Sequence, residues 1–396
     1  MKRIYMDYAA ATPVDERVAR TVSVLNKKHY ANPSGLHKEG QETRRVFEEA
    51  RGAVAQNMGA HADEIVFTSG ATEANNIAIQ GVVRAARARG ITRPHIIVSA
   101  IEHASVLETA RMLSGEDVRV ELLRVDRKGV VDVRELRKII TPETVLVSVM
   151  YANNEIGTIQ PLREIAKEVR HTRKMHASLY PYFHTDAAQA SNYLDTNVLR
   201  LGVDLMTLSS GKSYGPRGVG VLFVKRGVNL VALSYGGEHE RGRRPGTEVV
   251  ALACGFAEAL VLAENIKPKE VLRIKKLRDT LAEKILKKVS GVVVNGDLAH
   301  SLPNLLSISL EGVESEALII YLDAQGFAVS GGSACKSASG KMSHVLTAIG
   351  YTNEKNMGAI RFSLGRFTKS EDITRLVKEL PAMVKVLRDA RKNSDF

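Results

Sequence analysis

Lys212 and Asp186 are the two residues whose types and settings point most directly to chemistry. Lys212 lies on a turn of small residues between two apolar runs, at residues 205–208 and 219–224, that predict strands. Such a lysine is typical of an amine that holds a carbonyl group as a Schiff base, although a solvated surface lysine is the ordinary alternative in a basic chain. Asp186 follows another strand-like run. Because enzymes that use pyridoxal 5′-phosphate (PLP) need both an amine for the aldehyde and a carboxylate for the pyridine nitrogen, the pair predicts a PLP enzyme.

A strand also turns directly into a predicted helix through Gly70, within residues 67–76. A helix start offers unpaired backbone N–H groups and the positive end of a dipole, which suit a phosphate, and the Thr72 hydroxyl adds a donor. Helix capping by Ser69 or Thr72 is the alternative explanation of the same residues. Next to a Schiff-base lysine, we expect a phosphate site here.

Two further polar residues, His103 and Asn154, follow strand-like runs. An imidazole can stack on a pyridine ring and transfer protons near neutral pH. Asn154 can donate a hydrogen bond to the cofactor phenolate or to a substrate carboxylate. A structural histidine and a turn asparagine are the ordinary alternatives. The 11 histidines show no convincing metal-ligand spacing, so no metal site is expected.

Cys335 is surrounded by glycine, serine and alanine, with Lys336 next to it. Structural cysteines normally lie among apolar residues, so this setting favours an exposed loop in which positive charge stabilises a reactive thiolate. Downstream, Arg361 lies inside an apolar, strand-like run. A bidentate grip on an α-carboxylate is one reason to bury a guanidinium there, and a structural salt bridge is the other.

Strand-like runs alternate with helix-period segments along the first two thirds of the chain, for example at residues 64–68 and 71–87. This alternation predicts an α/β fold with a mainly parallel sheet covered by helices. Ligands of such sheets bind at the carboxyl ends of the strands, so the residues named above are expected along one edge. After Cys254, a long helical stretch leads to a second, smaller unit with short strands at residues 307–310 and 327–330.

The composition limits the classes of protein that fit. The chain has 396 residues, of which 44% are hydrophobic, and a formal net charge of +12. Its basic clusters lie largely on predicted amphipathic helices and its aromatic content is only 5%, so direct nucleic-acid binding is not expected. No apolar run approaches the roughly 20 residues that span a bilayer, and two cysteines are too few for a disulfide framework. We therefore expect a soluble, cytoplasmic protein without membrane contact.

Taken in order, these motifs resemble those of cysteine desulfurases of the NifS/IscS type, a branch of the class-V aminotransferases and of the fold-type I PLP enzymes. The resemblance covers essentially the whole chain, from residues 5–10 to residues 360–368. It implies the α/β fold of a fold-type I PLP-dependent transferase. A large PLP-binding domain would cover residues 15–255, and residues 1–14 and 256–396 would form a smaller α/β domain that carries the catalytic cysteine loop.

The resemblance also implies a role for each candidate residue. Lys212 would hold PLP, His103 would stack on its ring and Cys335 would accept sulfur, which makes these three the catalytic residues. Asp186 would face the pyridine nitrogen and Gln189 the phenolate oxygen. The implied cofactor contacts are Ala71, Thr72, Asn154, Asp186, Gln189, Ser209, Gly211, Lys212 and Thr247. The implied substrate contacts are Arg361, Asn154 and Asn32.

The implied activity is a PLP-dependent removal of sulfur from L-cysteine, which gives L-alanine and a Cys335 persulfide. The persulfide would pass to acceptor proteins such as an iron–sulfur scaffold or a tRNA-thiolation factor. In the family, a threonine that matches Thr247 reaches the phosphate bound by the neighbouring subunit, so a homodimer is implied. Gly211 departs from the family, which usually has a histidine there that contributes to the phosphate site.

Two classes of alternative remain open. A class-V aminotransferase or a selenocysteine lyase would share the PLP residues, but a transaminase has no need of Cys335. A non-catalytic sulfur-assembly or regulatory protein would keep the fold, and the glycine at position 211 is compatible with that.

Overall fold

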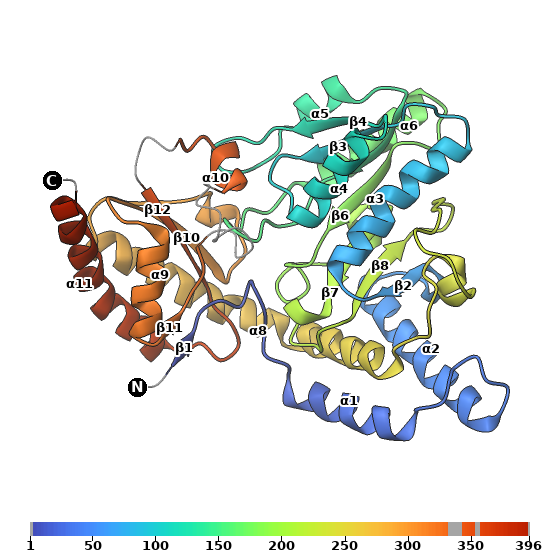
Figure 1. Cartoon of the computed structure of the whole chain (residues 1–396), viewed down its shortest axis with the longest axis horizontal. Coiled ribbons are helices and arrows are strands. Elements are labelled where there is room, and N and C mark those ends of the chain that lie inside the picture. Colours follow the sequence, from blue (N-terminus) through green and yellow to red (C-terminus); the bar gives the residue numbers. More distant parts are fainter. Residues whose placement is uncertain (1–2, 332–342, 353–356, 395–396) are drawn as a thin grey trace.

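The computed structural model describes residues 3–331, 343–352 and 357–394, and within them a seven-stranded sheet forms the central layer of the larger part of the molecule (Figure 1). Its strands are short, mostly apolar runs. They are β2 (Ile65–Thr68), β3 (His95–Ser99), β4 (Arg119–Leu123), β5 (Thr144–Ser148), β6 (Tyr182–Asp186), β7 (Leu205–Ser209) and β8 (Gly220–Val224).

The strand order across this sheet is β2-β8-β7-β6-β5-β3-β4. The strand β8 is antiparallel to both of its neighbours, β2 and β7, whereas all other neighbours are parallel. Five of the strands, β2, β3, β5, β6 and β8, are buried along their whole length, as expected of a parallel sheet with helices on both faces. The predicted α/β fold with a mainly parallel sheet is confirmed.

Helices cover the two faces of the central sheet. On one face, α2 (Lys38–Met58), α5 (Val133–Ile139), α6 (Leu162–Met175), α7 (Val198–Leu201) and the first part of α8 (Val250–Lys288) share an apolar core with the strands. On the other face, α3 (Ala71–Ala88) and α4 (Ala104–Ser114) form a separate apolar cluster with them. The helix α1 (Glu16–Lys28) packs along α8.

A further apolar core surrounds the antiparallel sheet β12-β10-β9. The strand β1 pairs in parallel with β11, so Ile4 and Met6 pack in this core together with residues from the other end of the chain. The elements of this part are β1 (Ile4–Tyr5), β9 (Val292–Val294), β10 (Leu305–Glu311), α9 (Ser315–Ala324), β11 (Phe327–Ala328), β12 (Met357–Ser363) and α11 (Ser370–Ser394). The short helix α10 (His344–Ala348) packs in a separate small cluster with Ile101 and Met150.

The helix α8 belongs to both parts of the molecule. It is 39 residues long; Phe256 and Leu260 pack in the first core, and Ile274 and Leu281 pack in the second. The helix runs without a break through residue 255, where a domain boundary is expected from the sequence. The division into domains at this residue stays a prediction.

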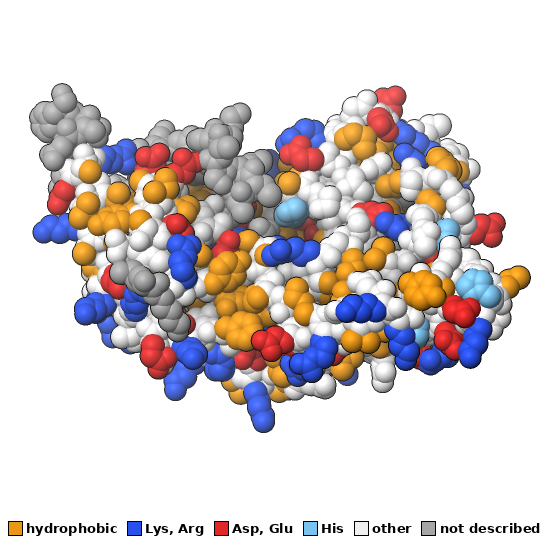
Figure 2. Space-filling model, turned by 60° about the horizontal axis from the view of Figure 1, so that its bottom comes forward, with side chains coloured by type: hydrophobic (Ala, Val, Ile, Leu, Met, Phe, Trp, Pro, Cys, Tyr) orange, Lys and Arg blue, Asp and Glu red, His pale blue; other side chains and the backbone are white. Residues whose placement is uncertain are grey.

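Charges of both signs are mixed on one face of the molecule. Figure 2 shows Lys and Arg side chains interspersed with Asp and Glu rather than gathered in one patch. Several pairs follow the helical spacing that brings opposite charges together, such as Arg45–Glu49 and Lys275–Asp279. Among the helices that the structure describes, none is both long and apolar enough to cross a bilayer.

Candidate active site

Four of the candidate residues lie where neighbouring strands of the central sheet end. His103 is the N-cap of α4, after β3, and Asn154 follows β5. Asp186 is the last residue of β6, and Lys212 ends the short turn η2 (Ser210–Lys212) after β7. Because β3, β5, β6 and β7 are parallel neighbours, their carboxyl ends share one edge of the sheet (Figure 1).

Lys212 is half-buried, and its amine contacts main-chain carbonyl groups. Its Nζ donates to the oxygen of Ala9 at 2.7 Å and to that of Ala10 at 2.6 Å. Gln189 Nε2 donates to the same Ala9 oxygen at 2.9 Å. The N-terminal segment therefore forms one side of the site.

Asp186 is buried, and its carboxylate accepts two hydrogen bonds. Its Oδ1 accepts from the main-chain N–H of Ala188 at 2.9 Å, and its Oδ2 accepts from Asn75 Nδ2 at 2.7 Å. Asn75 lies on α3 and is fully buried. These two donors fix the orientation of the carboxylate at the end of β6.

His103 is linked to the same asparagine. Its Nδ1 accepts from the main-chain N–H of Ser105 at 3.1 Å and lies 2.9 Å from Ser105 Oγ. That hydroxyl oxygen in turn accepts from Asn75 Nδ2 at 2.8 Å. His103 and Asp186 are therefore connected through two residues that the sequence did not single out.

The start of α3 has no side-chain cap. Its N-cap is Gly70, so neither Ser69 nor Thr72 caps the helix, and the capping alternative is wrong. The main-chain N–H of Ser69 donates to the carboxylate of Glu73, whose other oxygen accepts from Arg244 Nε at 3.0 Å. An uncapped helix start remains able to bind an anion.

Arg361 lies on β12 with its side chain 2% exposed. Its Nη1 donates to the main-chain oxygen of Asn154 at 2.7 Å, and its Nη2 pairs with Asp7 Oδ1 at 2.7 Å. The structure thus brings Arg361 and Asn154 together. It also contains the salt bridge that the sequence offers as the alternative reason for burying this guanidinium.

Cys335 lies outside the described residues. The described residues on either side of its segment are anchored beside the site. Ser330 forms a β-bridge with Arg361. His344 Nε2 lies 2.9 Å from the main-chain oxygen of Glu102, just before α4. Described residues on both sides of Cys335 therefore contact Arg361 or the segment that precedes His103.

The remaining candidates differ in their positions. Ser209 and Gly211 lie beside the lysine, at the end of β7 and in the turn that follows. A Cβ added at Gly211 would contact only Arg217 Cγ, at 3.6 Å, which is an ordinary van der Waals distance. Asn32 and Thr247 are exposed, on the loops that precede α2 and α8, and none of the hydrogen bonds or ion pairs of the described residues links them to the other candidates.

Burial shifts the pKa of two groups at this edge. Glu102 is fully buried and accepts from Ser99 Oγ and from the main-chain N–H of Met150, both at 2.6 Å. Burial raises the pKa of Glu102 to about 8. Burial lowers the pKa of His184 on β6 to about 4. Both groups are therefore uncharged at neutral pH.

The set of donors fits PLP. An amine, a carboxylate and an uncapped helix start lie along one sheet edge, and they match the aldehyde, the pyridine nitrogen and the phosphate of that cofactor. Among the described residues, no group of three or more His, Cys, Asp or Glu side chains is arranged to hold a metal ion.

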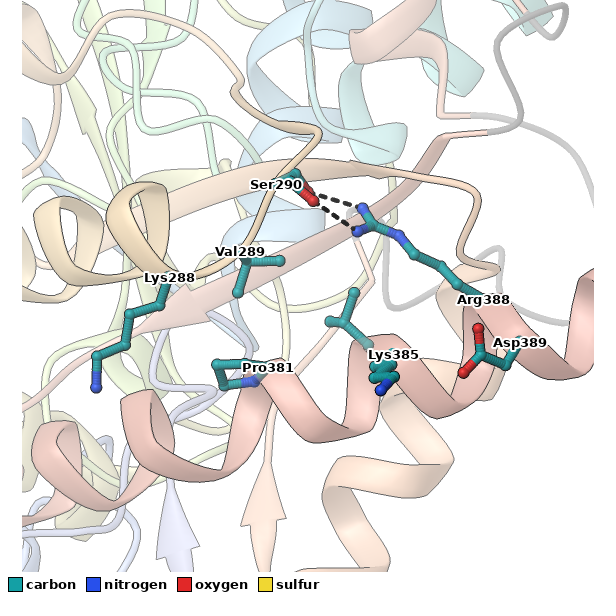
Figure 3. Close-up of a pocket in the computed structure, with 8 residues that line it drawn as sticks. Lys288, Val289, Ser290, Pro381, Lys385, Arg388 and Asp389 are labelled. Atoms are coloured by element: carbon teal, nitrogen blue, oxygen red, sulfur yellow. Dashed lines mark hydrogen bonds between the residues drawn. The ribbon is translucent and has the colours of Figure 1, made fainter.

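A surface cavity of about 240 Å³ lies away from these residues, between the end of α8 and α11 (Figure 3). The guanidinium of Arg388 donates there to the main-chain oxygen of Ser290 at 2.8 Å. None of the candidate site residues lines this cavity, whose walls are Lys288, Val289, Ser290, Pro381, Val384, Lys385, Arg388 and Asp389.

Comparison with known proteins supports the resemblance. The aminotransferase class-V family matches residues 4–376. A cysteine desulfurase IscS from Dictyoglomus turgidum is 42% identical over 389 residues, which cover 98% of this chain and 96% of that protein. A solved NifS-like protein has a TM-score of 0.89 and 34% identity, and the match covers 97% of this chain and all of that one. The structure of SspA in complex with cysteine has a TM-score of 0.79 and 32% identity, over 92% of this chain and 99% of that one. Motifs, fold and relatives agree that this chain belongs to the class-V aminotransferase family, in its branch of NifS- and IscS-type cysteine desulfurases.

Proposed function

We propose that this protein is a PLP-dependent cysteine desulfurase that removes sulfur from L-cysteine and leaves L-alanine. The proposal rests on the arrangement of Lys212, Asp186 and His103 at the ends of neighbouring strands. Relatives that match nearly the full length of the chain are named cysteine desulfurases, which supports it. The solved relative with bound cysteine supports L-cysteine as the substrate.

Five of the predicted contacts would bind the aldehyde, the pyridine nitrogen and the phosphate of the cofactor. Lys212 would bind the aldehyde and Asp186 the pyridine nitrogen. Ala71 and Thr72 at the start of α3, with Ser209 at the end of β7, would bind the phosphate. When bound, PLP supplies an electron sink that stabilises negative charge on the substrate α-carbon.

Arg361 would bind the carboxylate of L-cysteine, with Asn154 beside it. The main-chain oxygen of Asn154 and the carboxylate of Asp7 accept from its two terminal nitrogens and so fix the plane of the guanidinium. A planar fork of donors held in one orientation suits a planar carboxylate.

The chemical step needs two groups that bind or transfer protons and one nucleophile that accepts sulfur. The Lys212 amine would remove the α-proton, and His103 would hold the proton of the substrate thiol. The Cys335 thiolate would attack the substrate sulfur, so that an S–S bond forms and the Cβ–S bond breaks. The electron pair of the broken bond stays on Cβ, which takes up one proton and becomes the methyl group of alanine.

The persulfide on Cys335 would then pass to acceptor proteins, such as an iron–sulfur scaffold or a tRNA-thiolation factor. We also propose a homodimer in which Thr247 contributes to the phosphate site of the other subunit, and its exposed loop position supports this. A reducing, cytoplasmic location is proposed because two cysteines are too few for a disulfide framework.

The test is an assay of the purified protein with L-cysteine and a thiol reductant, without an added keto acid. We expect alanine and sulfide in equal amounts and a sulfur adduct on the peptide that contains Cys335. Cys335→Ser should keep the PLP absorbance and release only traces of sulfide, because a hydroxyl is a far poorer nucleophile towards sulfur.

Cys254→Ser is the matched control, because the Cys254 thiol is buried and contacts the main-chain oxygen of Val46 at 3.7 Å. This variant should keep its sulfide release. Near-normal sulfide from Cys335→Ser, or alanine that forms only with a keto acid, would contradict the proposal and favour a transaminase.

A further inference from the structure

A chain of three hydrogen bonds joins Asp186 to His103. Asn75 Nδ2 lies 2.7 Å from Asp186 Oδ2 and 2.8 Å from Ser105 Oγ, and Ser105 Oγ lies 2.9 Å from His103 Nδ1. Asn75 is fully buried, and Ser105 and Asp186 are 9% and 6% exposed. Bulk water therefore has little access to the bonds in the middle of the chain.

The direction of each bond follows from the chemistry of the groups. An ionised carboxylate only accepts, so the Asn75 amide must present its NH₂ group to Asp186. The second hydrogen of that NH₂ group then points to Ser105 Oγ. The Ser105 oxygen accepts there, which leaves its own hydrogen available for His103 Nδ1.

The main chain imposes the same direction on the imidazole. His103 Nδ1 also accepts from the main-chain N–H of Ser105, a group that can only donate. Nδ1 is therefore an acceptor, and the neutral ring has its hydrogen on Nε2. Within the described residues, Nε2 has no hydrogen-bond partner, so it is the ring nitrogen available to a ligand.

We propose that Asn75 and Ser105 are positioning residues that let the charge of Asp186 select the tautomer of His103. The proposal rests on the site roles proposed above for those two residues. Without a negative charge at Asp186 the Asn75 amide can turn over, and its oxygen then accepts the Ser105 hydrogen. The hydroxyl would no longer donate to Nδ1, and the Nε2–H form would lose one of its two supporting bonds.

The experiment is ¹⁵N NMR of the full-length protein labelled at histidine, in its PLP-free and PLP-loaded forms, with His103→Gln to assign the signals. In the unmutated protein we expect an unprotonated Nδ1 and a protonated Nε2. Asp186→Asn, which keeps the shape but removes the charge, should raise the share of the Nδ1–H form about three- to tenfold, as expected from one lost net hydrogen bond.

Coupling through the bridge is tested by combining variants. Ser105→Ala should itself raise the share of the Nδ1–H form, and adding Asp186→Asn to it should cause no further change. Ser105→Thr keeps a hydroxyl and should restore the response. If Ser105→Ala does not fold, Asn75→Leu breaks the same bridge one bond earlier, and adding Asp186→Asn to it should likewise cause no further change.

Thr109→Val is the control, because Thr109 Oγ1 lies 2.8 Å from the main-chain oxygen of Ser105 and 3.0 Å from Asn76 Oδ1 but takes no part in the bridge. It should leave the tautomer ratio unchanged. A dominant Nδ1–H form in the unmutated protein, or an equal effect of Asp186→Asn with and without the Ser105 hydroxyl, would overturn the proposal. The NMR result does not depend on turnover, so a protein that keeps the bridge but makes no alanine would overturn the proposed function alone.

Discussion

At the scale of single residues, Arg361 has a buried guanidinium with two fixed acceptors. The main-chain oxygen of Asn154 and the carboxylate of Asp7 each bind one terminal nitrogen. A lysine at this position would be a point charge on a flexible stem and would not keep a flat pair of donors facing a carboxylate.

Arg361→Lys should therefore raise the KM for L-cysteine about tenfold or more, since a charge-assisted hydrogen bond contributes roughly 1.5–3 kcal/mol. The value of kcat should fall less. Steady-state kinetics of alanine formation measures both. An unchanged KM would assign carboxylate binding to another residue.

Gly211 gives a second prediction at this scale. Its backbone is not in the left-handed region, and a Cβ would make only an ordinary contact with Arg217 Cγ, so the turn accepts a side chain without strain. Gly211→His should lower the Kd for PLP up to about tenfold, because the imidazole adds a donor for the phosphate. Titration of the apoprotein measures this, with Gly211→Ala as the control. Weaker binding by both variants would show that glycine is needed for the backbone.

The sequence identified residues whose type suggests chemistry, but it missed those that orient them. Lys212, Asp186 and His103 were found because an amine, a carboxylate and an imidazole at strand ends are informative in themselves. Asn75 and Ser105 are common polar residues whose role depends on the packing of α3 against α4. The carbonyl groups of Ala9 and Ala10 had no signal at all, since every residue has one.

At the scale of elements, the close approach of β8 to the start of α3 depends on Gly220. A Cβ there would lie 2.7 Å from Gly70 Cα and carbonyl carbon and 2.9 Å from the main-chain oxygen of Leu208. All of these are backbone atoms, which cannot move aside as a flexible side chain can. The glycine thus sets where α3 begins relative to the sheet edge.

Gly220→Ala should lower the free energy of unfolding by about 1–3 kcal/mol, a typical cost of overpacking. It should also weaken PLP binding, because the helix start must shift. Denaturant unfolding of the apoprotein checks the first effect and PLP titration the second. Gly52→Ala on α2 is the control. A Cβ there would have no neighbouring atom within 4 Å, so the free energy of unfolding should be unchanged or slightly higher. Equal stability of the two variants would contradict this account.

Apolar periodicity was enough to predict the alternation of strands and helices, because burial on one or both faces determines it. It could not predict that β8 runs antiparallel to its neighbours, since an apolar run reads the same in either direction. Nor did it show that α8 continues from one core into the next. The length of α8 depends on the two apolar cores against which its two halves pack, and these cores are formed by other segments of the chain.

At the scale of the whole molecule, Glu102 should make stability depend on pH. Its pKa is about 8 in the folded protein against an ordinary 4.5, because the carboxyl group is buried. Between these values the unfolded chain releases this proton and the folded chain keeps it. Glu102 therefore lowers stability increasingly as pH rises from about 4.5 to about 8.

Glu102→Gln should remove this pH dependence, since its amide does not titrate. The gain in free energy of unfolding of the variant over the unmutated protein should be larger at pH 8 than at pH 5. Urea unfolding at the two pH values measures the difference, and Glu108→Gln, at an exposed position on α4, is the control. The same stability difference at both pH values would mean that Glu102 is ionised in the folded protein.

The pairing of β1 with β11 has a consequence for the order in which the molecule is completed during synthesis. Ile4 and Tyr5 leave the ribosome before the strands of the central sheet, and their partners Phe327 and Ala328 emerge after those strands. Ala9 is held by the hydroxyl of Ser363, which emerges later still. A nascent chain can therefore assemble the central sheet while the carbonyl groups that bind Lys212 are not yet in place, so this site is completed only after the sheet that carries it.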